Sequence, residues 1–274
     1  MTESHFVNSE TRFQFGQNWL DYSVLIDDEK IAQAERRLIK LLGSGALENK
    51  TFLDIGCGSG LHSLAALRLG AKQVLAIDLD PKSVATTQAV LNKFWRQNNF
   101  TVEQCSVFDL HTTGKGKFDI VYSWGVLHHT GNMVKAIEQA SDRVKANGLL
   151  ALALYGKTRH CERWTKIKYW YINATSEQQA KAERWYVRLF GFYILLRGKR
   201  LATHIANYNQ KRGMDFYYDV RDWIGGYPYE SISPDQLRQI LTPRSFSIKK
   251  ENVRRRSGLF GSGNDEYLFI KVGT

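Results

Sequence analysis

Short apolar runs and amphipathic stretches alternate along the chain from residue 50 onward. Five apolar runs have the length of buried strands, and stretches with helical spacing separate most of them. The strands are expected at 51–57, 73–79, 100–108, 118–124 and 147–155, and the helices at 61–71, 81–95 and 132–145. Strands separated by helices of this length predict a mainly parallel sheet with right-handed crossovers.

The alternation stops for about eighty residues after the fifth strand and then resumes. A helix is predicted at 233–241, with Ser233 as its N-cap and Pro234 at its first position. Strands at 245–253 and 266–272 follow with no helix between them, so they should pair antiparallel at the sheet edge. We therefore predict an α/β fold: a Rossmann-like, mostly parallel seven-stranded sheet with an antiparallel C-terminal strand pair.

The same pattern divides the chain into three parts. Residues 1–50 are predicted to form an N-terminal helical cap. Residues 51–155 and 233–274 form the core, and residues 156–232 form a large, basic and aromatic helical insertion after the fifth strand.

The net charge of +11 is concentrated in residues 155–212. Residues 155–212 contain thirteen lysines and arginines against three glutamates, which leaves the rest of the chain close to neutral. Any attraction to an anionic partner is expected from this segment.

The N-terminal segment, the apolar runs and the cysteines argue against several protein classes. The N-terminal segment is polar and mixed in charge, unlike a signal peptide, and the longest apolar runs are too short to cross a bilayer. Cys57, Cys105 and Cys161 are odd in number and far apart, which argues against a disulfide framework and against structural zinc. We expect a cytoplasmic protein.

The stretch "LDIGCGSG" (53–60) lies where the first strand turns into the first helix. Its glycines, Gly56, Gly58 and Gly60, allow a sharp turn and a close approach to a ligand, and Asp78 ends the next strand. The spacing departs from the G-x-G-x-x-G of nicotinamide sites. A nucleotide-like ligand beyond the strand ends is favoured over a tight turn without a ligand.

Four motifs, "LDIGCGSG", "AIDLD", "SVFD" and "FDIVYSWGVLHH", together resemble the class I S-adenosylmethionine-dependent methyltransferases. The resemblance covers residues 51–155 and the terminal strand pair, and it is greatest to small-molecule and quinone-type O-methyltransferases. It implies S-adenosyl-L-methionine as the cofactor. The cofactor-binding residues that it implies are Asp54, Gly56, Gly58, Gly60, Asp78, Leu79, Phe108, Asp109, Ser123 and Trp124.

The resemblance also implies individual roles within this set. Asp54 would brace the glycine loop or reach the methionine amine, and Asp78 would accept hydrogen bonds from both ribose hydroxyls. Leu79 would pack on the adenine. Asp109 would bind the adenine amine, although a turn-capping role is also open. Trp19 and Tyr22, in the cap, would be lid residues over the cofactor or ordinary helix-packing residues.

His128 and His129 follow the strand that ends beside the methyl group. The resembling enzymes have an acidic residue and then a histidine here, so His129 matches their histidine and His128 replaces the acidic residue. Each is a candidate base for removing a hydroxyl proton. Hydrogen bonding in the substrate pocket remains open. No metal is expected, because adjacent histidine side chains normally diverge.

The insertion leaves several interpretations open. The run 184–200 joins apolar and aromatic residues to basic flanks, which suits a helix on an anionic membrane surface, a groove for a lipid tail or a lid with a solvated face. Residues 214–231 are predicted to form one wall of the substrate pocket, which we call the substrate wall. The alternative is a structured turn that packs on the sheet. The residues of the substrate wall would be Asp222, Trp223, Tyr227 and Tyr229.

The motifs that are absent narrow the acceptor atom. The position after the fourth strand reads "SWGV", without the Asn/Asp-Pro-Pro-aromatic run of amino-methylating enzymes, and no cysteine adjoins a proline. We therefore expect O-methylation of a small-molecule or lipid-linked acceptor. An RNA methyltransferase that uses the basic segment 155–212 is the alternative, with nucleic acid less favoured than an anionic membrane surface or a phosphate-bearing ligand. A third reading is a cofactor-binding protein without catalysis.

Overall fold

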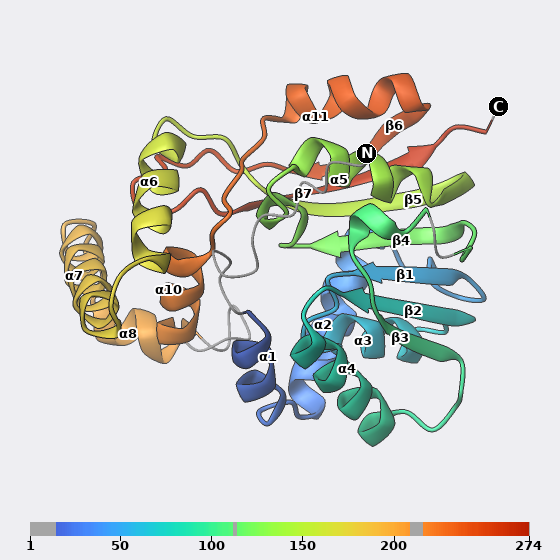
Figure 1. Ribbon diagram of the computed structural model, residues 1–274, viewed down its shortest axis with the longest axis horizontal. Helices are drawn as coiled ribbons and strands as arrows, with labels where there is room; N and C mark the ends of the chain where they lie inside the picture. Colours follow the sequence, from blue (N-terminus) through green and yellow to red (C-terminus); the bar gives the residue numbers. More distant parts are fainter. Residues whose placement is uncertain (1–14, 112–113, 209–215, 274) are drawn as a thin grey trace, which may run out of the picture.

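The computed structural model describes residues 15–111, 114–208 and 216–273. Its centre is a seven-stranded sheet of order β3-β2-β1-β4-β5-β7-β6, in which β7 runs antiparallel to both neighbours and the other pairs are parallel (Figure 1). The strands are β1 (Thr51–Ile55), β2 (Gln73–Asp78), β3 (Phe100–Gln104), β4 (Phe118–Trp124), β5 (Val144–Tyr155), β6 (Phe246–Asn252) and β7 (Asn264–Lys271). The predicted fold class is confirmed.

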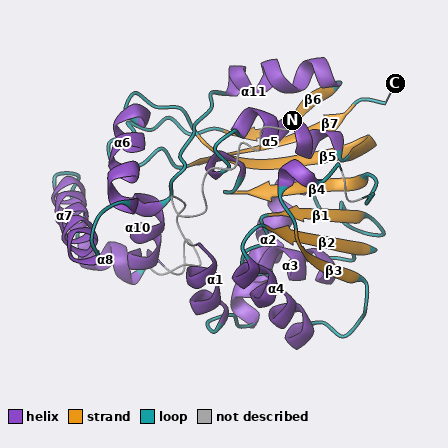
Figure 2. Ribbon diagram, in the orientation of Figure 1, coloured by secondary structure: helices purple, strands orange, loops and turns teal. Residues whose placement is uncertain are grey.

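Helices cover both faces of the sheet (Figure 2). One face carries α2 (Asp28–Leu42), α3 (Leu61–Arg68) and α4 (Pro81–Phe94), and the other carries α5 (Met133–Asp142) and α11 (Pro234–Leu241). Successive strand residues alternate between the faces. In β4, Ile120 packs with α2, α3 and α4, whereas Val121 packs with α5 and α11.

Local capping fixes where several helices begin. The Asp80 side chain accepts from the Lys82 backbone N–H before α4, with Pro81 at the first position. Ser233 forms a capping box with Gln236 at the start of α11, as its position in the sequence predicts.

The strand boundaries differ most from the sequence-based expectation at β3 and β5. β3 ends at Gln104 instead of residue 108, because Ser106 caps a short 3-10 turn, η2 (Val107–Asp109). β5 begins at Val144 instead of residue 147. The pairing shifts register there, and Asn147 has a φ of 59°, so the strand continues through an irregularity that hydrophobic alternation does not predict.

The helix α1 and the described part of the insertion lie at the carboxyl ends of the parallel strands (Figure 1). The helix α1 (Phe15–Ser23) packs on α4, whereas α2 belongs to the layer over the sheet. The insertion contains α6 (Cys161–Ile172), α7 (Ser176–Leu195), α8 (Leu201–Ala206) and α10 (Phe216–Gly225). Residues 1–14 of the cap, and Lys211 and Arg212 of the basic segment, lie outside the described residues. Among the described helices, none is long and apolar enough to cross a membrane.

Candidate active site

The loop from Gly56 to Gly60 joins β1 to α3. Gly56, Gly58 and Gly60 have φ values of 78°, 55° and 75°, in the left-handed region that favours glycine. A Cβ atom on Gly56 would lie 2.4 Å from Cγ2 of Val126, and one on Gly60 would lie 2.9 Å from Cγ2 of Thr87. Backbone conformation and close packing therefore both require glycine here.

Asp78, at the end of β2, lies beside this loop. Its carboxylate accepts hydrogen bonds from the backbone N–H groups of Gly58 and Asp80, each at 3.0 Å. A carboxylate held against a glycine turn at the carboxyl edge of a parallel sheet is the arrangement that receives ribose hydroxyls in nucleotide sites. The geometry thus supports the role that the motif resemblance implies.

Asp54 is buried beneath the loop and accepts a 2.6 Å hydrogen bond from the Ser63 hydroxyl of α3. Burial raises the pKa of Asp54 to about 7, while the Ser63 hydrogen bond opposes this rise and the Asp78 charge adds to it. Of the two roles expected for Asp54, the structure shows the bracing contact, which ties β1 to α3.

α1 places an aromatic side chain directly over the glycine loop. A Cβ atom on Gly58 would lie 3.0 Å from Cε2 of Trp19, and the Trp19 and Tyr22 rings meet edge to face at 6.1 Å. The backbone N–H of Gly16 anchors this helix by donating to Asp80 at 3.0 Å. The cap therefore lies where the predicted lid residues would cover a cofactor.

Three further predicted residues lie on the same edge of the sheet. Leu79 follows β2 and is 42% exposed, while Phe108 and Asp109 belong to η2, after β3. Because β2 and β3 pair in parallel, these residues share one edge. An exposed leucine beside Asp78 suits packing on an adenine ring.

Ser123 and Trp124, at the end of β4, already have partners within the protein. The buried Ser123 hydroxyl donates to the Ile55 carbonyl at 3.0 Å, and the Trp124 indole N–H donates to Glu266 at 3.4 Å. The Ser123 side chain thus ties β4 to β1, so a contact between Ser123 and the methionine part of the cofactor would come from its backbone.

His128 is fully buried in the short 3-10 turn η3 (Leu127–His129). Its Nδ1 accepts the backbone N–H of Tyr155 at 3.2 Å, which leaves the proton of the neutral ring on Nε2. Burial holds the pKa of His128 well below its usual value, and the charges of His129 and Lys168 add to this effect. His128 is therefore a neutral donor whose lone pair is already used.

His129 has the opposite arrangement. Its Nδ1 lies 2.7 Å from the carbonyl oxygen of Pro228. A carbonyl oxygen only accepts, so Nδ1 donates and the lone pair of the neutral ring lies on Nε2. The ring centroids of Phe15 and His129 lie 5.1 Å apart. A Cβ atom on Gly226 would lie 2.8 Å from Cε1 of His129. This is the tautomer that a general base needs.

α10 joins the insertion to the cap. The Asn18 amide of α1 donates to the Asp222 carboxylate, across 204 positions of sequence. Burial raises the pKa of Asp222 to about 7, the Asn18 hydrogen bond opposes this rise, and the Asp219 charge adds to it. Asp219 and Asp222 lie on the same helix, α10, which ends at Gly225.

Lys168 of α6 is fully buried in an aromatic cage that sequence reasoning missed. Its Nζ donates to the Trp223 carbonyl and lies 3.9 Å from the Trp223 ring centroid, 5.1 Å from that of Tyr229 and 5.9 Å from that of Tyr155. Burial lowers its pKa well below the usual value, while the Asp222 charge opposes this. Nothing in the sequence distinguishes Lys168 from the solvated basic residues around it.

Of the other predicted wall residues, Trp223 and Tyr229 meet edge to face with ring centroids 5.9 Å apart, whereas Tyr227 packs on a different ring. Trp223 meets Tyr155 edge to face at 5.3 Å. The buried Tyr229 donates its hydroxyl to Sγ of Cys161 at 3.3 Å, which makes its hydroxyl part of the internal packing. Tyr227 lies against the exposed Tyr169 ring at 5.4 Å, and its contact with substrate stays a prediction.

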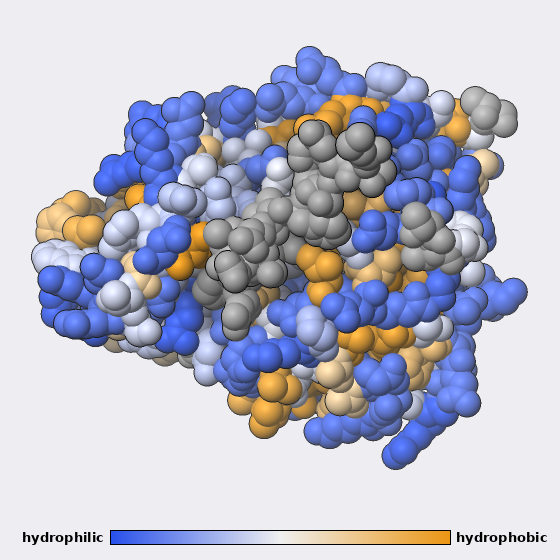
Figure 3. All heavy atoms as spheres, in the orientation of Figure 1, coloured by the Kyte–Doolittle hydropathy of each residue, from blue (hydrophilic) through white to orange (hydrophobic). Residues whose placement is uncertain are grey.

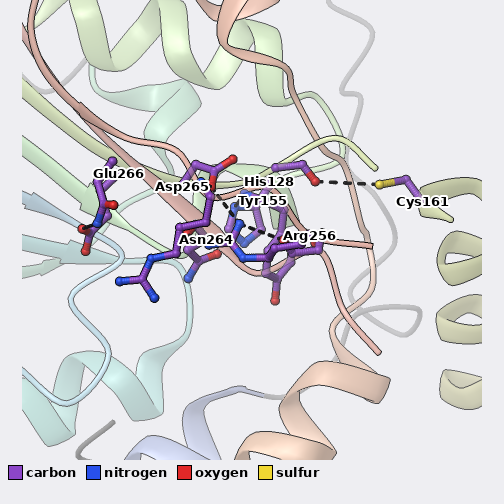
Figure 4. Close-up of polar contacts among 11 residues, drawn as sticks. His128, Tyr155, Cys161, Arg256, Asn264, Asp265 and Glu266 are labelled. Carbon is purple, nitrogen blue, oxygen red and sulfur yellow. Dashed lines mark hydrogen bonds and ion pairs between the residues drawn. The ribbon is translucent and has the colours of Figure 1, made fainter. Parts of the chain in front are cut away.

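Three buried polar atoms around Tyr155 have no hydrogen-bond partner within the described part of the chain: Nε2 of His128, Nε1 of Trp223 and Oδ1 of Asn264. Asn264 pairs with Tyr155 across β7 and β5, and His128 lies next to both (Figure 4). Buried polar groups are normally hydrogen-bonded, so these two donors and one acceptor suit the polar atoms of a ligand. Asn264 was missed because it precedes the strand predicted from residue 266.

Comparison with known proteins supports the assignment of the core. A methyltransferase domain family matches residues 53–152, from the glycine loop to β5. The curated relatives include tRNA U34 carboxymethyltransferases of Shewanella halifaxensis (strain HAW-EB4) and Shewanella loihica, each 35% identical over 106 residues. The matched segment is 39% of this chain and spans only 32% of the length of those relatives.

Solved structures extend the likeness in fold over nearly the whole chain. Magnesium protoporphyrin IX methyltransferase from Synechocystis PCC 6803, with bound S-adenosylhomocysteine, has a TM-score of 0.52 and 17% identity, covering 95% of this chain and 89% of that one. An O-methyltransferase family protein from Burkholderia thailandensis has a TM-score of 0.55 and 13% identity, covering 94% and 60%. At these identities the likeness concerns the fold.

The family match and the geometry agree on the same part of the chain. Residues 53–152 contain the glycine loop, Asp78 and both histidines. The matched family is a methyltransferase domain family, and two structures of similar fold hold S-adenosylhomocysteine or S-adenosylmethionine, the cofactor that the motifs predict. Residues 53–152 of this chain are thus similar to a methyltransferase domain.

Proposed function

We propose that the protein transfers the methyl group of S-adenosylmethionine to a hydroxyl oxygen of a small-molecule or lipid-linked acceptor in the cytoplasm. The tautomer of His129, fixed by the Pro228 carbonyl at 2.7 Å, carries the proposal. Nε2 of His129 takes the hydroxyl proton while the oxygen attacks the methyl carbon. The carbon–sulfur bond breaks and leaves S-adenosylhomocysteine.

The surroundings of His129 favour an enclosed acceptor. The activated sulfonium needs an aligned nucleophile and little water, because the transfer is an in-line displacement. Phe15 packs against His129, and the contact of Asn18 with Asp222 joins the cap to the insertion. Aromatic rings, including those of Tyr155 and Trp223, gather beside this point. Such surroundings suit a small or flat acceptor.

An RNA acceptor is the second candidate. Two observations favour it: relatives of the matched segment are tRNA U34 carboxymethyltransferases, and the segment 155–212 is strongly basic. The enclosed position of His129 favours the small acceptor, because a nucleotide would have to leave its stack to enter such a site.

Labelled methyl transfer separates these candidates. The protein is incubated with methyl-labelled S-adenosylmethionine and, in parallel, with lipid extract, aqueous small-molecule extract and total RNA. We expect label in one of the first two fractions and its loss with His129→Ala. Label that appears only in RNA and is released by ribonuclease would replace this proposal with the RNA alternative.

A further inference from the structure

The helix α7 has a fixed inner face. Tyr186 donates its hydroxyl to the Phe260 carbonyl at 2.7 Å, Phe190 lies 6.1 Å from the Phe216 ring, and Ile194 is buried. Glu183 also turns inward, where it accepts from the Tyr171 hydroxyl at 2.5 Å and pairs with Arg221. These contacts determine which side of α7 faces solvent.

The opposite side of α7 is apolar. Five large side chains, each 53% to 72% exposed, form what we call the α7 outer face: Trp185, Leu189, Phe192, Leu195 and Leu196. Spacings of four, three and four residues place Trp185, Leu189, Phe192 and Leu196 along one side of the helix. Figure 3 shows hydrophobic side chains gathered at this end of the molecule. Contiguous exposed apolar residues mark an interaction surface, because leaving them in water is costly.

Basic side chains border the α7 outer face. Lys181, Arg184 and Arg188 are exposed along the helix, and Arg197, Lys199 and Arg200 are exposed just after it. The Arg188 guanidinium lies 5.9 Å from the Trp185 ring. The only acidic residue between 181 and 200 is Glu183, which faces inward. The surface therefore combines apolar anchors with positive charge.

We propose that the α7 outer face docks on an anionic lipid bilayer. A helix with tryptophan, phenylalanine and leucine on one side and basic residues beside them lies at the boundary between lipid headgroups and acyl chains. Each lysine or arginine near the surface adds attraction to anionic headgroups. RNA would also attract the basic residues, but the leucines offer nothing to bases or phosphates and gain only by leaving water.

This docking surface is distinct from the methyl-transfer site. α7 packs on α10, within the insertion. The cofactor loop lies beneath α1, where Trp19 covers Gly58. Membrane docking therefore stands or falls independently of the acceptor, and substitutions on the α7 outer face should leave cofactor binding unchanged.

Vesicle co-sedimentation of the full chain tests the proposal. The probes are vesicles of phosphatidylcholine alone and of phosphatidylcholine mixed with phosphatidylglycerol. We expect binding to the mixed vesicles, and a loss of about tenfold or more in Leu189→Ser/Phe192→Ser. The matched control is Ile248→Ser/Val272→Ser, which removes one exposed apolar side chain from β6 and one just after the end of β7 and should bind like wild type.

Charge reversal supplies the second arm. Lys181→Glu/Arg188→Glu should weaken binding to mixed vesicles by roughly fivefold or more for each residue, and Lys50→Glu/Lys72→Glu should not. Calorimetry with S-adenosylhomocysteine checks that every variant retains its fold.

Absent vesicle binding, or binding that survives Leu189→Ser/Phe192→Ser, overturns the proposal. Binding to total RNA that only the charge reversals weaken would identify an RNA surface, and a dimer lost in Leu189→Ser/Phe192→Ser would identify a subunit interface.

Discussion

The carbonyl oxygen of Pro228 fixes the ring of His129 through a 2.7 Å contact with Nδ1. The two residues come from distant parts of the chain, the turn after β4 and the turn after α10. Their contact places a lone pair on Nε2 of His129, whereas the lone pair of His128 is already used by the Tyr155 N–H. The adjacent histidines therefore have different chemistry, which yields separate predictions for each.

Removing the proposed base should reduce turnover without affecting the cofactor. We expect His129→Ala to lower kcat by about 10²–10⁴-fold, the contribution of general base catalysis. The affinity for S-adenosylhomocysteine should stay within error. A His129→Ala enzyme with normal turnover would exclude this histidine as the base.

His128 should matter for stability. Replacing it by alanine removes the acceptor of the half-buried Tyr155 N–H, which costs about 1–3 kcal/mol in the free energy of unfolding. Urea unfolding of His128→Ala and wild type measures the difference. His128→Asn offers a replacement acceptor and should recover part of it. An unchanged midpoint in His128→Ala would show that this hydrogen bond contributes little.

Asp222 should make stability depend on pH. Its pKa rises on folding from 3.8 to about 7, so the folded state holds a proton that the unfolded state releases. The stability of wild type relative to Asp222→Asn should therefore be greatest below about pH 4 and decrease until about pH 7, by on the order of 2–4 kcal/mol. Urea unfolding at a series of pH values measures this. A difference that is constant with pH would contradict the buried protonated carboxyl.

Asn264 should contribute to acceptor binding at little cost in stability. Its buried Oδ1 has no partner among the described residues, so Asn264→Leu breaks no hydrogen bond of that oxygen. We expect an unchanged or higher free energy of unfolding and an acceptor KM raised about tenfold, the effect of one lost hydrogen bond. Asn252→Leu, which breaks a 2.9 Å bond to Glu266 away from Tyr155, is the control and should lower stability with KM unchanged. Normal KM in Asn264→Leu would remove it from the acceptor site.

The sequence predicts the core of this fold because its signals are local. Glycines that need positive φ, Asp78 at a strand end and the alternation in β4 all lie within short segments. The start of α11, with Ser233 as the N-cap and Pro234 at the first position, follows from neighbouring residues in the same way. His129 was predicted by its place after β4, but its tautomer depends on Pro228, which lies 99 residues away.

The parts that sequence reasoning did not find depend on distant contacts. Asn18 meets Asp222 across 204 residues, and Lys168 is surrounded by rings from β5 and from the segment after α10. No periodicity records such pairings, so a buried lysine cannot be distinguished from its solvated neighbours. The end of β3 depends on a single cap at Ser106, which hydrophobic alternation does not reveal.

The most direct test of the account asks whether Asp78 binds the cofactor ribose. Calorimetry would compare S-adenosylhomocysteine with its 2′,3′-dideoxy analogue on wild type and on Asp78→Ala, in a cycle that isolates the pairwise energy. Wild type should bind the analogue about 10²-fold more weakly, the value of two hydrogen bonds to a carboxylate. Asp78→Ala should bind both ligands with equal, weak affinity. Wild type that binds neither ligand, or an equal loss with the analogue in both proteins, would contradict the assignment of this loop as the S-adenosylmethionine site.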